Sequence, residues 1–187
     1  MKNSSEIKDL LYNKIPLILL SHLTKNANNG NVYGTKVADE LEISQSGASI
    51  VLKQFKSMGI LTSENIGKTV VYNMNSDNAL VKSFRVFENL LELNDLVQNI
   101  NQYCRKIILF GSCCRGEDTV NSDIDLFIVA DDDNKDTVRN IISGYEIDRD
   151  LKPVIVNALE VIDMESTDKV FLNEVEKGIE LWGGRNE

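Results

Sequence analysis

Hydrophobic residues in the first part of the chain recur with the spacing of helices. Leucine and isoleucine residues follow this spacing through 7–26, where Pro16 indicates that one short helix ends and a second begins. Thr35 and Ser44 can each cap a further short helix, because an apolar stripe follows each of them. Gly59 fits the left-handed position that ends the second of these helices.

A β-hairpin and one long helix are predicted next. Two β-type runs occupy residues 60–74 around a polar turn at 65–68. Residues 78–103 contain no glycine or proline and place large apolar side chains at near-helical spacing. The apolar face of this helix is wide, so it either packs in the core of the monomer or forms the interface of a homodimer.

The second half of the chain predicts a sheet covered by helices. The continuous apolar run at 106–110 indicates a buried strand, and a second such run extends from Ser122 to Ala130. Further strands are expected at 151–156 and 178–182. Helical spacing at 133–145 and 164–176 supplies the covering helices.

Composition and cysteine usage narrow the class of protein. The 187 residues are 42% hydrophobic and 26% charged, which is typical of a globular protein and excludes a disordered chain. No signal peptide or membrane-spanning run is visible, so we expect a cytoplasmic protein with no membrane partner. The three cysteines, Cys104, Cys113 and Cys114, predict neither a disulfide scaffold nor a zinc site.

The charge is distributed unevenly along the chain. The net charge is −9, yet residues 1–77 carry 8 basic and 7 acidic side chains. Residues 78–187 carry 12 basic and 22 acidic side chains. An acidic region repels the phosphate backbone of nucleic acids, so any contact with DNA must come from the first part.

The segments 37–46 and 52–61 make residues 16–75 similar to the winged helix-turn-helix repressors of the MarR and ArsR type. The resemblance implies that the second short helix enters the major groove and that Lys68, at the tip of the wing, approaches the DNA backbone. Only four basic residues lie between 34 and 72, where four acidic residues balance them, so a module for protein binding or dimerisation is the alternative. The side chains of the second helix that would face DNA are Gln45, Ser46, Ser49, Ile50 and Lys53.

Paired carboxylates in the second half point to a divalent cation. Asp123 and Asp125 lie two residues apart in the predicted strand, so both point to one face of the sheet. Two carboxylates so placed repel each other unless a cation lies between them. Oxygen ligands without a nearby histidine or thiolate favour Mg²⁺, with Mn²⁺ as a substitute, shared with substrate phosphates.

The turn after the first buried strand suits a phosphate. Gly111 allows close approach of the backbone, and Ser112 offers a hydroxyl at the start of a helix. Gly111–Ser112, ten residues and then Asp123-x-Asp125 resemble the signature of the polymerase-beta-like nucleotidyltransferases. Arg115, Gly116 and Ser122 make the chain similar to the minimal nucleotidyltransferase family, whose members often occur as antitoxins.

The resemblance implies binding of a nucleoside triphosphate by Gly111, Ser112, Arg115, Gly116 and Ser122. It also implies a third carboxylate, normally on the next strand, that helps a second metal ion to activate the acceptor. The strand predicted at 151–156 contains no acidic residue, so we expect Asp150 to serve, with Asp148 as the next candidate.

Together these patterns predict an α+β protein of two domains. A winged helix-turn-helix domain spans 1–77, a linking helix spans 78–103, and an α/β nucleotidyltransferase core with a mixed sheet spans 104–187. We expect transfer of a nucleoside monophosphate to a hydroxyl of a protein, such as a cognate toxin, or of an RNA. The alternative is a DNA-binding transcriptional regulator whose second domain only binds nucleotide or a partner protein.

Overall fold

The computed structural model describes residues 15–26, 32–67 and 69–183. Contacts within the chain divide it into two compact units, Met1–Glu88 and Asn89–Glu187, which are described separately. In the described part of the chain, no helix is both long and apolar enough to cross a membrane.

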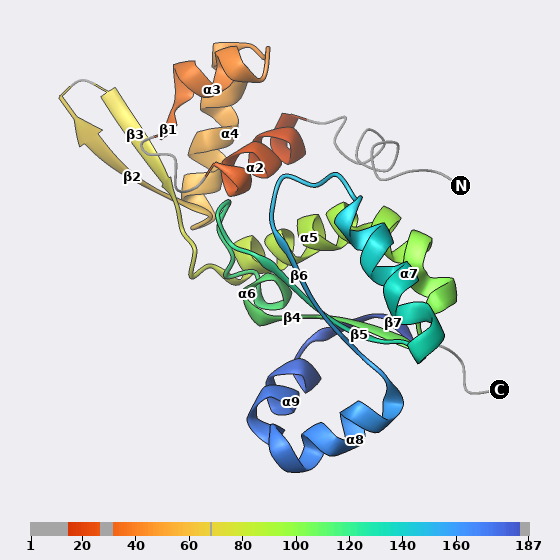
Figure 1. Ribbon diagram of the computed structural model, residues 1–187. Helices are drawn as coiled ribbons and strands as arrows, with labels where there is room; N and C mark the ends of the chain where they lie inside the picture. Colours follow the sequence, from red (N-terminus) through yellow and green to blue (C-terminus); the bar gives the residue numbers. More distant parts are fainter. Residues whose placement is uncertain (1–14, 27–31, 68, 184–187) are drawn as a thin grey trace. The chain divides into compact units, whose positions relative to one another are not determined.

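The first unit consists of short helices and a small antiparallel sheet (Figure 1). The strands pair in the order β1-β3-β2, so the hairpin of β2 and β3 is extended by the short β1. The elements are α2 (Ile15–Lys25), β1 (Val32–Tyr33), α3 (Gly34–Glu40), α4 (Gln45–Ser57), β2 (Leu61–Ile66) and β3 (Thr69–Met74).

Local sequence signals set the ends of these helices. The hydroxyl of Ser44 accepts a hydrogen bond from the amide of Gly47, 3.1 Å away, which confirms Ser44 as the cap of α4. Gly59 has a φ of 71°, as predicted for the residue that ends α4. The prediction for Thr35 is wrong by two residues: β1 runs directly into α3, so Tyr33 occupies the cap position and Thr35 lies inside the helix.

One long helix, α5 (Ala79–Ile100), begins in the first unit and ends in the second. The side chain of Asn78 accepts a hydrogen bond from the amide of Leu80 at 2.8 Å, so the helix begins one residue later than predicted. It ends at Ile100 in a single 3₁₀ turn, Asn101–Tyr103. Much of its apolar face is used within the monomer, because Val81 is buried in the first unit and Leu93, Leu96, Val97 and Ile100 are buried in the second.

The second unit contains the predicted mixed sheet. Its strand order is β6-β5-β4-β7; β4 is antiparallel to both β5 and β7, and β5 is parallel to β6. The remaining elements are β4 (Lys106–Phe110), α6 (Gly111–Arg115), β5 (Ile124–Val129), α7 (Asp132–Ser143), β6 (Leu151–Val156), α8 (Ala158–Thr167), α9 (Lys169–Glu176) and β7 (Ile179–Gly183).

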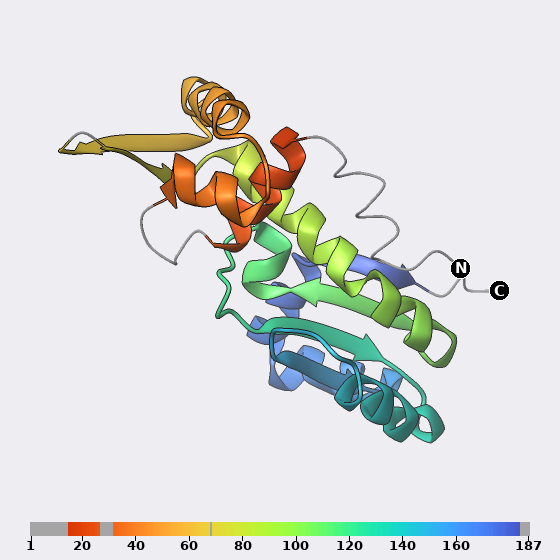
Figure 2. The ribbon, with the colours of Figure 1, turned by 90° about the horizontal axis from the view of Figure 1, so that it is seen from above.

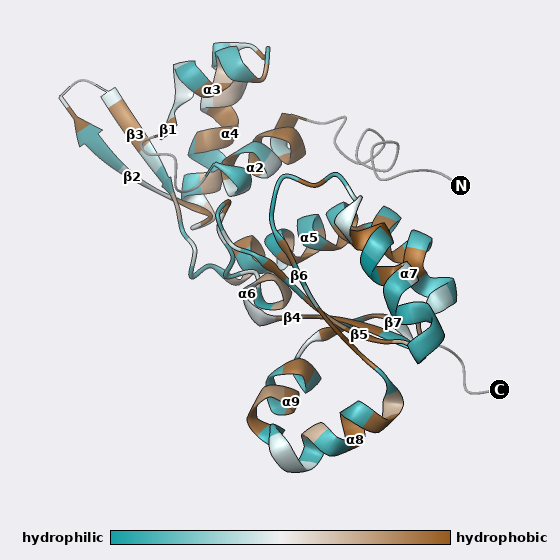
Figure 3. Cartoon of the chain, viewed as in Figure 1, coloured by the Kyte–Doolittle hydropathy of each residue, from teal (hydrophilic) through white to brown (hydrophobic). Residues whose placement is uncertain are grey.

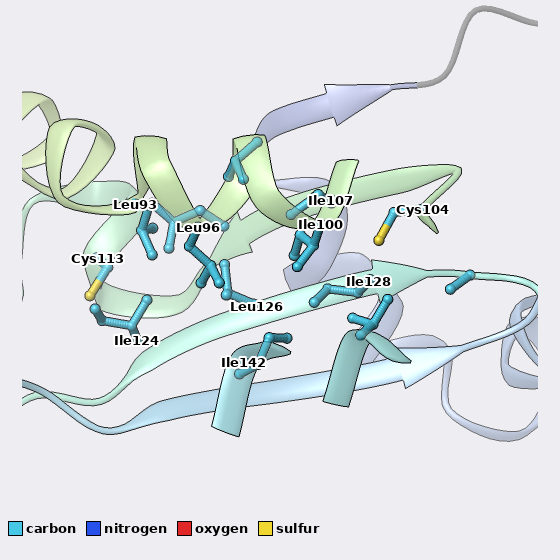
Figure 4. Close-up of a cluster of buried hydrophobic side chains, with 14 residues drawn as sticks. Leu93, Leu96, Ile100, Cys104, Ile107, Cys113, Ile124, Leu126, Ile128 and Ile142 are labelled. Atoms are coloured by element: carbon cyan, nitrogen blue, oxygen red, sulfur yellow. The ribbon is translucent and has the colours of Figure 1, made fainter. Parts of the chain in front are cut away.

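Helices cover both faces of this sheet, and the central strands are correspondingly hydrophobic (Figures 2 and 3). On one face, Ile124, Leu126 and Ile128 of β5 pack against side chains of α5 and α7 (Figure 4). On the other face, Phe127 packs with Leu172 and Val175 of α9. The period of two along β5 therefore divides its side chains between two cores.

The helical region before β7 differs from the prediction. One helix was expected over 164–176, but two helices are present, and the chain leaves the helical conformation at Asp168. The Asp168 side chain accepts a hydrogen bond from the amide of Phe171 and caps α9. A capping box of Asn157 and Glu160 begins α8.

Candidate nucleotide-binding site

The Gly111 turn and the start of β5 lie side by side. In the antiparallel pair of β4 and β5, Phe110 is the partner of Asp125, so the turn that follows β4 lies next to the Asp-x-Asp segment. Gly111 has a φ of 73°, and a Cβ atom added there would lie 2.3 Å from Oδ2 of Asp125. Only glycine allows this approach of the backbone to the carboxylate.

The turn continues into the short helix α6. Ser112 is half-buried in its first turn, and Gly116, with a φ of 65°, ends the helix in the left-handed conformation. The guanidinium of Arg115 is about half-exposed and donates from Nε to Glu117 over 3.0 Å. This hydrogen bond raises the pKa of Arg115, which therefore remains a cation at the edge of the turn.

Asp123 and Asp125 are brought together at the start of β5. Asp125 lies in the strand and Asp123 immediately before it, where the amide of Ile124 donates to the carbonyl of Asp150 and continues the pairing with β6. Burial raises the pKa of Asp125, and the charge of Asp123 raises it further, whereas the charge of Lys152 opposes the shift. The pair is thus a site where added positive charge is favourable.

Ser122 lies immediately before Asp123, and its side chain forms hydrogen bonds within the preceding turn. Its hydroxyl accepts a hydrogen bond from the amide of Thr119 at 2.9 Å and lies 3.2 Å from the Thr119 hydroxyl. These bonds shape the turn that precedes Asp123. In this conformation Ser122 orients the loop, and its predicted contact with nucleotide stays a prediction.

The structure does not place the predicted third carboxylate in one metal-binding group with Asp123 and Asp125. Among residues 15–26, 32–67 and 69–183, no group of three His, Cys, Asp or Glu side chains is placed to hold a metal ion. The Asp150 side chain is 80% exposed, and its Oδ2 lies 3.8 Å from Nζ of Lys152. Asp148 is also exposed, in the bend before β6.

The carboxylate pair alone fits a hard divalent cation. Mg²⁺ commonly takes one or two protein carboxylates and completes its coordination with water and substrate phosphates. Burial and, after it, the charge of Asp123 raise the pKa of Asp125, and a bound cation would offset both effects. Asp123 and Asp125 are therefore the residues that would hold it.

A buried network of ion pairs and hydrogen bonds contacts α6, the helix that begins at the Gly111 turn. The Arg149 side chain is 10% exposed; it pairs with Glu92 and with Asp118, whose carboxylate is 2.9 Å away. Arg149 also donates to the side-chain oxygen of Asn89 over 2.7 Å. Asn89 in turn donates to the carbonyl of Cys113 and to Asp118, so the network connects α5, α6 and the loop after α6.

The network also shifts the pKa values of the ionisable groups in and beside it. Burial tends to lower the pKa of Arg149, but the charge of Glu92 and its other partners outweigh this effect and raise it. The thiol of Cys113, packed against the network, has its pKa raised to about 11 by burial and by the charge of Asp118. Arg149 therefore stays charged and the Cys113 thiol stays protonated near neutral pH.

The residues predicted to contact DNA lie on α4 in the first unit. Gln45, Ser46, Ile50 and Lys53 are exposed, and Ser49 is partly buried. Lys68 lies outside the described residues.

Comparison with known proteins identifies the second unit. Residues 92–187, just over half of the chain, match the family described as "Polymerase beta, Nucleotidyltransferase". The chain therefore belongs to the polymerase beta nucleotidyltransferase family. This match confirms the nucleotidyltransferase part of the sequence prediction. No protein of curated function matches the sequence significantly.

Several solved structures are similar to part of the chain. AF1382 from Archaeoglobus fulgidus is 17% identical, with 51% of this chain and 96% of that chain covered and a TM-score of 0.35. A toxin-antitoxin with AMP-PNP is 25% identical, with 52% and 75% covered and a TM-score of 0.35. A putative nucleotidyltransferase from Sulfolobus solfataricus is 15% identical, with 57% and 90% covered and a TM-score of 0.38.

Replacing Gly111 tests the close approach to Asp125. Gly111→Ala introduces a Cβ atom against Oδ2 of Asp125, so we expect at least about a tenfold loss of affinity for an Mg²⁺-bound ATP or GTP analogue in titration calorimetry. Gly67→Ala is the matched control, because Gly67 has a φ of 62° but nothing within 4 Å of an added Cβ. Equal affinities of the two variants would contradict the role given to the turn.

Replacing Arg149 tests the buried network. Arg149→Met leaves Asp118 and Glu92 without their cation, which we expect to lower the free energy of unfolding in urea by about 3 kcal/mol. Arg139→Met is the control: Arg139 pairs with Asp136 on the surface of α7, so its loss should cost less than about 1 kcal/mol. Similar losses in both variants would show that the network adds little stability.

Proposed function

We propose that the chain transfers a nucleoside monophosphate from a nucleoside triphosphate to an acceptor hydroxyl on a protein or an RNA. The observation that carries this proposal is the approach of the Gly111 backbone to the Asp125 carboxylate, which puts a turn suited to phosphate beside a pair suited to a cation. Membership of the nucleotidyltransferase family supports the reaction type.

The reaction exchanges the phosphoanhydride bond between the α- and β-phosphates for a phosphoester bond to the acceptor. A bond forms between the acceptor oxygen and the α-phosphorus, and the bond from the α-phosphorus to the bridging oxygen breaks. Pyrophosphate leaves with the electron pair of that bond, and the proton of the acceptor passes to solvent. Catalysis in such displacements depends on positioning and on stabilisation of charge.

The side chains of the site have separate roles in this proposal. Asp123 and Asp125 would hold Mg²⁺ or Mn²⁺, which when bound neutralises charge on the triphosphate and polarises its phosphoryl oxygens. Ser112 donates its hydroxyl to a terminal phosphate, and Arg115 adds positive charge at the edge of the turn. Asp150, exposed before β6, is the carboxylate that would act directly on the acceptor hydroxyl.

The acceptor class follows from the resemblance to antitoxins of the minimal nucleotidyltransferase family. We propose a cognate toxin protein as the first candidate and RNA as the second. The acidic second unit repels a phosphate backbone, which favours a protein acceptor.

Incubation with radiolabelled nucleoside triphosphates, Mg²⁺ and candidate acceptors tests the enzyme. We expect label on the acceptor with the natural chain and a loss of at least about a hundredfold in rate with the Asp123→Asn, Asp125→Asn double variant, because the cation is lost. Asp133→Asn is the control, since Asp133 is an exposed residue in the first turn of α7. Nucleotide binding without transfer to any acceptor would instead support a regulator that only binds nucleotide.

The surface of α4 supports DNA binding as a second function of the same chain. Ser44 caps α4, whose exposed residues are mainly polar, and the hairpin of β2 and β3 follows it as the wing does in winged helix-turn-helix proteins. In this proposal the winged domain spans 1–77, the linking helix 78–103 and the catalytic domain 104–187. A homodimer would present two copies of α4 to paired half-sites.

Fluorescence anisotropy with promoter DNA of its own operon tests this function. We expect affinity to fall with rising salt, and Lys53→Ala to weaken binding about threefold to tenfold through loss of one contact. Lys177→Ala is the control, because Lys177 pairs with Glu174 in the second unit. Equal binding of promoter and random DNA by the natural chain would exclude sequence-specific recognition.

A further inference from the structure

A lysine stands beside the carboxylate pair on the neighbouring strand. In the parallel pairing of β5 and β6, the Cα partner of Asp125 is Lys152. Paired residues of adjacent strands point to the same face of a sheet. The next pair on this face, Phe127 and Val154, packs in one hydrophobic cluster, so Lys152 and Asp125 start on the same side of the sheet.

The ammonium group of Lys152 is available to a ligand. The side chain is 54% exposed, and its nearest ion partner, Oδ2 of Asp150, is 3.8 Å away, beyond hydrogen-bond distance. Its charge also acts on Asp125. Lys152 therefore adds positive charge directly to the acidic end of β5.

The position of Lys152 beside Asp125 disfavours a second divalent cation at the site. A second divalent cation needs a further oxygen ligand close to the pair, and the described residues supply no third His, Cys, Asp or Glu in such a group. The residue paired with Asp125 on the neighbouring strand is instead a cation. Like charges repel, so the ammonium of Lys152 disfavours a second metal ion at this point.

We propose that Lys152 takes the place of a second metal ion and binds a phosphate oxygen of the nucleotide. The site then holds one divalent cation per nucleotide, between Asp123 and Asp125, and the lysine supplies the remaining positive charge. A lysine ammonium is a compact charge with three donors and is well suited to phosphate. This inference rests on the proposed nucleotide-binding function and specifies which groups supply positive charge to the bound nucleotide.

Counting bound Mn²⁺ tests the inference without measuring catalysis. The full chain is titrated with Mn²⁺ in the presence of a non-hydrolysable ATP or GTP analogue, and free Mn²⁺ is followed by electron paramagnetic resonance. We expect one Mn²⁺ per bound nucleotide in the natural chain. Lys152→Asp removes the cation and adds a ligand, so it should bind a second Mn²⁺.

A second variant separates phosphate binding from metal counting. Lys152→Met should keep one Mn²⁺ but bind the nucleotide about tenfold more weakly, through loss of one charged contact. Lys106→Met is the control: Lys106 is the partner of Val129, at the opposite end of β5, and pairs with Glu180. The Lys106→Met variant should change neither the number of bound Mn²⁺ nor the affinity for the nucleotide. Circular dichroism verifies that each variant is folded.

The outcomes distinguish this inference from the function on which it rests. Two Mn²⁺ per nucleotide in the natural chain, or an unchanged nucleotide affinity in Lys152→Met, would overturn the role of Lys152 alone. Absence of both nucleotide and Mn²⁺ binding in the natural chain would overturn the proposed nucleotide site together with the inference.

Discussion

A single buried guanidinium holds together the segments that shape the candidate site. Arg149 pairs with Glu92 of α5 and with Asp118 of the loop after α6, and Asn89 extends the network to the backbone of α6. A buried cation is stable only when its partners remain in place, because an uncompensated charge in the interior is costly. The network therefore fixes α6, and with it the Gly111 turn, against the helix that covers the sheet.

Within this network-stabilised unit, the pairing of the strands determines where the residues of the candidate site lie. The antiparallel pairing of β4 with β5 brings the end of one strand to the start of the next, so Gly111 meets Asp125. The parallel pairing of β5 with β6 adds Lys152 from the other side. Three segments that are distant along the chain thus supply a turn, a carboxylate pair and a cation at one end of the sheet.

The parts of this arrangement that depend on local sequence could be predicted. Continuous apolar runs indicated β4 and β5, but β5 begins at Ile124, so Asp123 lies just before the strand in which it was expected. The break at Asp168 was missed because a capping aspartate inside a helical pattern resembles an ordinary surface residue of the helix. The cap of α3 was misplaced because β1 runs into the helix without a polar residue between them.

The rest depends on contacts that no local pattern contains. Arg149 meets Asn89 and Glu92 across 60 and 57 residues of sequence, and only the tertiary fold determines that pairing. Likewise, the register of β6 decides whether Asp150 or Lys152 lies beside Asp125, because the two residues share a face and a shift by two residues would exchange them. The family resemblance implied a third carboxylate on the next strand, and Asp150 was the residue expected to supply it. The register instead places a lysine there, so the charge balance of the site is a property of strand alignment, and the count of nearby acidic residues does not determine it.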